Sequence, residues 1–164
     1  MAEEAFTDLS AGKDTAEIIQ AEKSALLLIA RAEQCLYGLK CKLEKKKYSN
    51  TVIQTVLDRL VSLNLVNDRR YAELWLKGRI NKCKNGPRFL LQLLRAKGIE
   101  KETAKEALAS LLPLETETAL LRRCLEKFVP DKTAGGDQKT AAKFFLKNQG
   151  FSAAAIEQYF EEEE

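Results

Sequence analysis

The stretch LRAKGIE at residues 94–100 decides the fold of this 164-residue chain, because it recurs in related form at two other places. Residues 43–49 read LEKKKYS and residues 146–152 read LKNQGFS, so successive copies are offset by 51 and 52 residues. In each copy a leucine is followed four residues later by glycine or lysine, and then by an apolar or aromatic residue. A period of this length is typical of stacked structural repeats.

Each copy is interpreted as the end of one helix, a tight turn and the start of the next helix. Gly98 and Gly150 occupy the position after a helix where a left-handed backbone conformation favours glycine. Ser49 or Asn50, and Ser152, are then candidate N-caps of the helix that follows. After each turn, apolar residues four positions apart predict one buried helix face, at Ile53 and Leu57, Ala104 and Leu108, and Ile156 and Phe160.

The rest of each period predicts one more helix ahead of this hairpin. The expected helices span residues 18–31, 32–47 and 50–64, then 68–83, 86–97 and 101–111, then 115–129, 138–149 and 152–160. Strong turn residues mark breaks at 64–68, 85–87, Pro113 and 130–136. Few prolines and glycines and no alternating β-branched runs argue against strands. The chain is predicted to be all-α, with three tandem three-helix repeats stacked into an elongated, curved body.

The predicted repeats cover residues 18–66, 67–113 and 114–160. Residues 1–17 are expected to form a flexible acidic N-terminal extension, and residues 161–164 an acidic tail.

Charge is distributed unevenly along the chain. Residues 1–22 hold six acids against one base, whereas residues 69–97 hold nine bases against Glu73 alone. A solvated helix face usually interleaves both signs, so the second segment favours contact with a polyanion. A merely solvated basic face is the alternative.

Composition argues against several functions. The chain has no histidine and no Gly-rich phosphate loop, so no catalytic site and no cofactor are expected. The cysteines Cys35, Cys41, Cys83 and Cys124 form no Cys-x-x-Cys pair, and reduced thiols in or near the core are expected rather than a metal site. The longest apolar stretch, residues 25–30, is too short to span a bilayer, and the N-terminus is acidic. A cytoplasmic protein without membrane contact is therefore expected.

Part of the second predicted repeat resembles the signature of the RecX family. The resemblance rests on LVNDRRYA at residues 65–72, Arg79, GPR at 86–88 and LLRAKGI at 93–99, and it extends more weakly from about Ser24 to Phe160. It implies a monomeric helical protein that binds the filament of the RecA recombinase on single-stranded DNA. It further implies inhibition of RecA ATP hydrolysis, strand exchange and co-protease activity, within homologous recombination, DNA repair and the SOS response.

The chain departs from the family pattern in the first repeat. Where the family tends to have Ser-x-x-Glu-Leu, residues 35–39 read CLYGL, and Lys47 stands where the other two repeats have glycine. Glycine inside a helix costs about 1 kcal/mol relative to alanine, so Gly38 is interpreted as the mark of a close helix approach.

Several signature residues have scaffold explanations. Asp68 is a candidate N-cap, Pro87 suits the first turn of a helix, and Trp75 extends an apolar face. The aromatic residues are expected mostly in the core, namely Tyr37, Tyr48, Tyr71, Trp75, Phe89, Phe144 and Phe145.

The basic residues that packing does not explain are the candidates for binding a partner or DNA. They are Arg69, Arg70, Lys77, Arg79, Lys82, Arg88, Arg95 and Lys97. Arginine suits phosphate and carboxylate because its planar group can donate two parallel hydrogen bonds. The alternative function is a stand-alone helical DNA-binding protein acting through residues 69–97, on single-stranded or double-stranded DNA. That alternative predicts tight, steeply salt-dependent binding to bare DNA.

Overall fold

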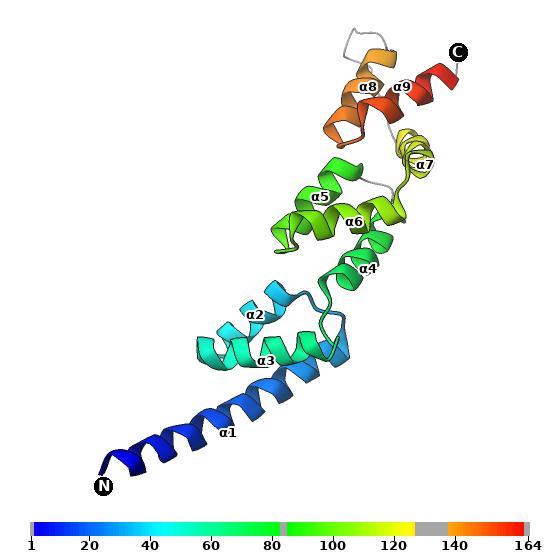
Figure 1. Cartoon of the computed structure of the whole chain (residues 1–164). Coiled ribbons are helices and arrows are strands. Elements are labelled where there is room, and N and C mark those ends of the chain that lie inside the picture. The colour runs from blue at the N-terminus through cyan, green and yellow to red at the C-terminus, as the bar shows by residue number, and fades with distance from the viewer. Residues whose placement is uncertain (1, 83–84, 127–137, 163–164) are drawn as a thin grey trace. The chain divides into compact units, whose positions relative to one another are not determined.

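The computed structural model describes residues 2–82, 85–126 and 138–162, and all regular structure in these ranges is α-helical (Figure 1). The helices are α1 (Ala2–Arg31), α2 (Leu36–Lys45), α3 (Asn50–Ser62), α4 (Asp68–Ile80), α5 (Pro87–Ala96), α6 (Lys101–Leu111), α7 (Leu114–Leu125), α8 (Gln138–Asn148) and α9 (Ala153–Glu162). The all-α prediction is confirmed, and the helices follow one another in the predicted order.

The first two helices differ from their expected bounds. Helix α1 begins at Ala2, well before the expected start at residue 18, and α2 begins at Leu36 rather than residue 32. The side chain of Gln34 explains the later start, because its Nε2 donates to the carbonyls of Leu28 and Ala32 at 3.2 and 2.9 Å. These bonds satisfy carbonyls at the end of α1 and interrupt the backbone. The flexibility of residues 1–17 stays a prediction, and the expected break at 130–136 lies outside the described residues.

The chain divides into two compact units, Met1–Tyr71 and Ala72–Glu164. The first unit contains α1, α2, α3 and the first turn of α4, and the second contains the rest of α4 and α5 to α9. The repeat boundaries predicted near residues 66 and 113 describe a finer division, and they stay a prediction.

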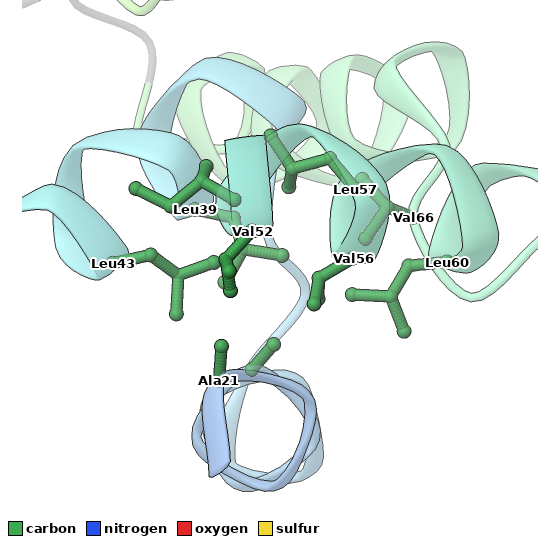
Figure 2. Close-up of a cluster of buried hydrophobic side chains, with 10 residues drawn as sticks. Ala21, Leu39, Leu43, Val52, Val56, Leu57, Leu60 and Val66 are labelled. Carbon is green, nitrogen blue, oxygen red and sulfur yellow. The ribbon is translucent and has the colours of Figure 1, made fainter. Parts of the chain in front are cut away.

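The core of the first unit is made where α1 packs on the α2–α3 hairpin. Ala21 and Ala25 of α1 have no exposed surface, and small side chains at these positions let the helix axes approach closely. In Figure 2, Ala21 lies on the face of α1 that is turned toward the leucine and valine side chains of α2 and α3. The buried cluster comprises Ala21, Ala25, Leu39, Leu43, Val52, Ile53, Val56, Leu57, Leu60 and Val66.

The three repeated turns share one backbone conformation. Lys47, Gly98 and Gly150 have φ angles of 66°, 82° and 85°, as expected for the left-handed residue that ends a helix. At the second turn the N–H of Ile99 donates to the carbonyl of Leu94 at 3.2 Å, and the third turn has the same bond from Phe151. The predicted role of the two glycines is confirmed, and Lys47 adopts the same conformation with a side chain present.

The N-cap of α4 differs from the prediction. Asn67 precedes the helix, and its Oδ1 accepts the N–H of Arg70 at 3.0 Å, so Asn67 and not Asp68 caps α4. Asp68 is the first helical residue, and its Oδ1 accepts the N–H of Leu36 at the start of α2, at 2.7 Å. The carboxylate therefore caps a helix, but a different one from that predicted.

Two serines occupy equivalent cap positions ahead of α3 and α9. Ser152 is an N-cap as predicted, because its Oγ accepts the N–H of Ala155 at 3.2 Å. Ser49 also precedes its helix, but its side chain makes no capping bond. The backbone N–H of Ser49 donates to Glu17 of α1 at 2.8 Å, and the backbone N–H of Ser152 donates to Glu117 of α7 at 2.7 Å.

In the second unit, the start of α5 is joined to the α8–α9 turn by backbone atoms. The N–H of Gly86 donates to the carbonyl of Gln149 at 2.8 Å, and the N–H of Arg88 donates to that of Gly150 at 3.0 Å. A Cβ on Gly86 would lie 2.5 Å from the nitrogen of Phe151, so only glycine fits there. The unpaired amides of one helix start thus satisfy the unpaired carbonyls of another helix end. Pro87 is the first residue of α5, as predicted.

Candidate partner-binding surfaces

Five of the eight predicted binding residues fall into three groups on the described structure. Arg69 and Arg70 lie in the first turn of α4, in the first unit. Arg79 and Lys97 lie beside Trp75 in the second unit. Arg88 lines a cleft in the second unit. Several of the predicted binding residues on α4, just after α4 and on α5 are exposed, namely Lys77, Arg79, Lys82, Arg88 and Arg95.

Arg70 is engaged by the protein itself. Its Nη2 lies 2.7 Å from Oε1 of Glu33, and its Nη1 and Nη2 donate to the carbonyls of Asn64 and Leu65 at 3.1 and 3.2 Å. The guanidinium thus fastens the α3–α4 connection to the connection between α1 and α2. These contacts give Arg70 a structural role, while its predicted contact with a partner stays a prediction.

Two cationic side chains lie over the ring of Trp75. The guanidinium carbon of Arg79 is 5.0 Å from the centroid of the indole ring, and Nζ of Lys97 is 5.7 Å from it. Both distances are within the range of cation–π attraction. The contact joins α4 to the end of α5, so two of the predicted binding residues are brought together around the single tryptophan of the chain.

Arg88 opens onto a cleft of about 510 Å³ between α5 and the α8–α9 hairpin. Two lysines of α8, Lys143 and Lys147, line the same cleft. Its other lining residues are Pro87, Leu91, Gly150, Phe151, Ser152, Ala153, Ile156 and Glu157. Three cations therefore share a concave, largely apolar space with one carboxylate.

The prediction from the sequence missed Lys143 and Lys147, because it considered only the basic segment 69–97. A signal was present, since α8 carries lysines at 139, 143 and 147, four residues apart, and no acid. Such spacing places the three lysines on one helix face. Lys139 and Lys143 lie over the ring of Phe160, at 5.7 and 5.3 Å from its centroid.

The expectation of core packing for the aromatic residues was wrong at three positions. Tyr37, Phe89 and Phe144 are exposed, and Phe144 keeps 66% of its surface accessible. Helical spacing misled because a residue next to an apolar face is turned away from the core by about 100° per position. The hydroxyl of Tyr37 has a raised pKa, chiefly through its hydrogen bond to Cys41.

Cys35 and Cys124 are buried and Cys41 is half-buried, so these three cysteines lie in or near a core, as expected. Cys83 lies outside the described residues. The close helix approach predicted at Gly38 was wrong, because the nearest atom to a Cβ there is Sγ of Cys35, at 3.0 Å and one turn back along the chain. Within the described ranges, no cluster of three or more metal-ligating side chains occurs. No described helix combines the length and apolar character needed to span a membrane.

Residues 67–108 match the sequence profile of the family described as "RecX, second three-helix domain". The chain is 34% identical over 113 residues to "Regulatory protein RecX" of Mycolicibacterium smegmatis, a match that covers 69% of this chain and 57% of that protein. It is 32% identical over 138 residues to the protein of the same name from Mycobacterium sp. (strain JLS), covering 81% and 75%.

Two solved structures share the fold. "Crystal structure of RecX from Lactobacillus salivarius" aligns with a TM-score of 0.80 at 22% identity, covering 90% of this chain and 97% of that one. "Crystal structure of regulatory protein RecX" aligns with a TM-score of 0.77 at 20% identity, covering 93% and 77%. The matched family domain, residues 67–108, contains all eight of the predicted binding residues.

Proposed function

Because the chain belongs to the RecX family of regulatory proteins, we propose that it regulates the RecA recombinase by binding the filament that RecA forms on single-stranded DNA. Binding is proposed to inhibit RecA ATP hydrolysis, strand exchange and co-protease activity. The chain acts by occupying a surface of the filament, and the protein needs no chemistry of its own for that. Its proposed setting is the cytoplasm, in recombination and DNA repair.

The observation that carries the proposal is the exposed basic surface along α4 and α5. Lys77, Arg79, Arg88 and Arg95 are all exposed, and no described carboxylate forms an ion pair with any of them. Charged side chains that are not neutralised within a protein steer an oppositely charged partner and set its orientation. A filament that presents both DNA phosphates and acidic side chains offers such a partner.

The test follows ATP hydrolysis by preformed RecA filaments on single-stranded DNA. The chain is titrated well below one copy per RecA, and inhibition is expected at these ratios. Arg79→Glu/Arg88→Glu should weaken inhibition by at least about tenfold, because two favourable charge contacts become repulsive. The matched control is Lys101→Glu/Arg123→Glu, which makes the same charge change at exposed positions on α6 and α7. Unchanged ATP hydrolysis at saturating protein would refute the proposal.

The second candidate is a protein that binds bare DNA without RecA. It is favoured by the exposure of Phe89 and Phe144, each next in sequence to a cation of the cleft. Exposed aromatic rings beside cations are typical of single-strand binding, where bases stack and phosphates pair. It predicts tight binding to an oligothymidylate with a steep salt dependence and no effect on RecA.

A further inference from the structure

We propose that the cleft between α5 and the α8–α9 hairpin binds an acidic peptide segment that carries one bulky apolar side chain among its carboxylates. The proposal rests on the proposed function only in taking a protein as the partner. It assigns a role to Lys143, Lys147 and the apolar lining, which the exposed surface of α4 and α5 does not include.

The cleft has the size and the preformed walls of a ligand site. Its volume of about 510 Å³ accommodates a large side chain and its neighbours. One wall is fixed by the backbone bonds from Gly86 to Gln149 and from Arg88 to Gly150, which hold α5 against the α8–α9 turn. Because these walls are joined by main-chain atoms, little ordering is needed when a ligand binds.

The lining combines an apolar part with cations. Leu91, Ala153 and Ile156 supply apolar surface, while Arg88, Lys143 and Lys147 supply positive charge. No described carboxylate forms an ion pair with these three cations. A ligand that places an apolar side chain between carboxylates complements both parts of the lining.

A peptide fits this lining better than a nucleic acid does. The one aromatic ring of the lining, Phe151, is only 5% exposed and cannot stack on a base. The start of α9 also offers few amides to a phosphate, because the N–H of Ser152 donates to Glu117 and that of Ala155 to the Ser152 hydroxyl.

The test measures fluorescence anisotropy of a fluorescein-labelled peptide with one phenylalanine flanked by glutamates. Saturable binding to the full-length chain is expected. Binding should weaken by at least about tenfold when the phenylalanine is replaced by alanine or the glutamates by glutamine. Lys143→Glu/Lys147→Glu should weaken it by about tenfold, whereas the control Lys101→Glu/Arg123→Glu should stay within about twofold.

A second variant addresses the apolar lining without altering charge. Leu91 is partly exposed, so Leu91→Ser is expected to leave the helical circular dichroism unchanged and to weaken binding of the peptide by several fold. Equal binding of the phenylalanine and alanine peptides would overturn the proposal, because the cleft would then recognise only the charge of the ligand. So would binding of an oligothymidylate, but not of the peptide, that depends on Lys143 and Lys147.

The two proposals fail separately because the peptide assay contains no RecA. Peptide binding without any effect on RecA ATP hydrolysis would overturn the proposed function and leave the cleft as an acidic-peptide site. Inhibition of RecA without peptide binding would overturn the cleft proposal alone.

Discussion

The carboxylate of Asp68 accepts a hydrogen bond from the backbone N–H of Leu36 at 2.7 Å, across 32 positions of sequence. Asp68 lies one turn before the buried Ala72, just as Glu17 lies one turn before the buried Ala21. Glu17 of α1 accepts the backbone N–H of Ser49, which precedes α3 in the same predicted repeat. The acid at the same place in α4 instead caps α2, a helix that precedes it in the chain. The start of α4 therefore belongs structurally to the first unit.

Replacing Asp68 by alanine is expected to destabilise the first unit by about 1 kcal/mol, because the start of α2 loses a charged acceptor. Asp68→Asn keeps an acceptor oxygen without the charge and should lose less. Urea unfolding followed by far-UV circular dichroism measures both. Asp58→Ala, which removes an exposed carboxylate that accepts a hydrogen bond from Gln54, is the control. Equal stability of the Asp68→Ala and Asp58→Ala variants would contradict the capping role.

A local cap should make Asp68 dispensable. Cys35 precedes α2 and makes no side-chain cap bond, and Gly38 follows three residues later. Cys35→Ser/Gly38→Glu introduces a capping box, in which each side chain bonds the other residue's backbone N–H. The loss caused by Asp68→Ala is expected to shrink by at least about half in this background. A loss of the same size in both backgrounds would show that the carboxylate acts elsewhere.

Arg70→Ala is expected to destabilise the first unit by about 1–3 kcal/mol, because a charged group loses hydrogen bonds to Glu33 and to two carbonyls. Arg70→Lys should restore little, since an ammonium group cannot reproduce the planar fork. The exposed Lys77→Ala serves as the control in the same urea experiment. If Arg70→Ala unfolds at the same urea concentration as the parent chain, its contacts contribute nothing to stability.

The three repeated turns should respond to substitution according to their φ angles. Gly98→Ala is expected to cost about 1–2 kcal/mol, the penalty of the left-handed conformation. Gly150→Ala should cost more, because a Cβ there would lie 2.7 Å from the nitrogen of Phe89. Lys47→Gly should stabilise the chain by up to about 1 kcal/mol, since strain relief exceeds the added entropy of the unfolded chain. Thermal and urea unfolding would contradict this account if Lys47→Gly were destabilising.

Trp75 should report directly on anion binding at Arg79. It is the only tryptophan, and Arg79 and Lys97 both lie over its ring, so a polyanion that draws either cation away changes the surroundings of the indole. Adding an oligothymidylate at low salt is expected to shift Trp75 emission saturably, and salt should reverse the shift. Arg79→Ala should reduce the shift, whereas Lys101→Ala should not. Binding detected by anisotropy without any change in emission would exclude Arg79 from the contact.

Tyr37 should ionise at a higher pH than an ordinary tyrosine. The hydrogen bond to Cys41, and then its charge, raise the pKa of the hydroxyl above 10.0. The contribution of the Tyr37 hydroxyl to the stability of the folded chain is therefore complete below the unfolded-state pKa, and it is lost as pH rises through the folded-state pKa. The ultraviolet difference titration between the parent chain and Tyr37→Phe isolates this group. Cys41→Ala should move the midpoint back toward the ordinary value, and an unmoved midpoint would rule out Cys41 as the cause.

Much of the fold could be predicted because it is specified by local patterns. Gly98 and Gly150 mark the turns, Pro87 marks the start of α5, and Ser152 marks the start of α9. Each of these roles depends on backbone conformation or on bonds within a few residues. The order of the helices could be predicted from the same turns, because the apolar spacing between the turns indicated helices and not strands.

The features that could not be predicted depend on contacts that are distant in sequence. Asn67 and Asp68 are both residue types that favour the N-cap position. In the structure Asn67 caps α4, whereas the carboxylate of Asp68 accepts the backbone N–H of Leu36. The contact of Arg70 with Glu33 was not predicted, because the two residues lie 37 positions apart in sequence, and the contact of Arg70 with a partner stays a prediction. Lys143 was passed over because its local charge density is lower than that of segment 69–97, although folding brings it to the same cleft as Arg88.

The backbone joint between Gly86 and the turn at Gly150 has a consequence for the order of events during synthesis. The amides at the start of α5 find their acceptors only after the ribosome has released the chain beyond residue 150. Until then these donors can bond only to water, and α5 lacks the neighbour that completes it. The helices α5 to α9 are therefore expected to become protected from hydrogen exchange together, as one cooperative folding unit rather than as two successive repeats.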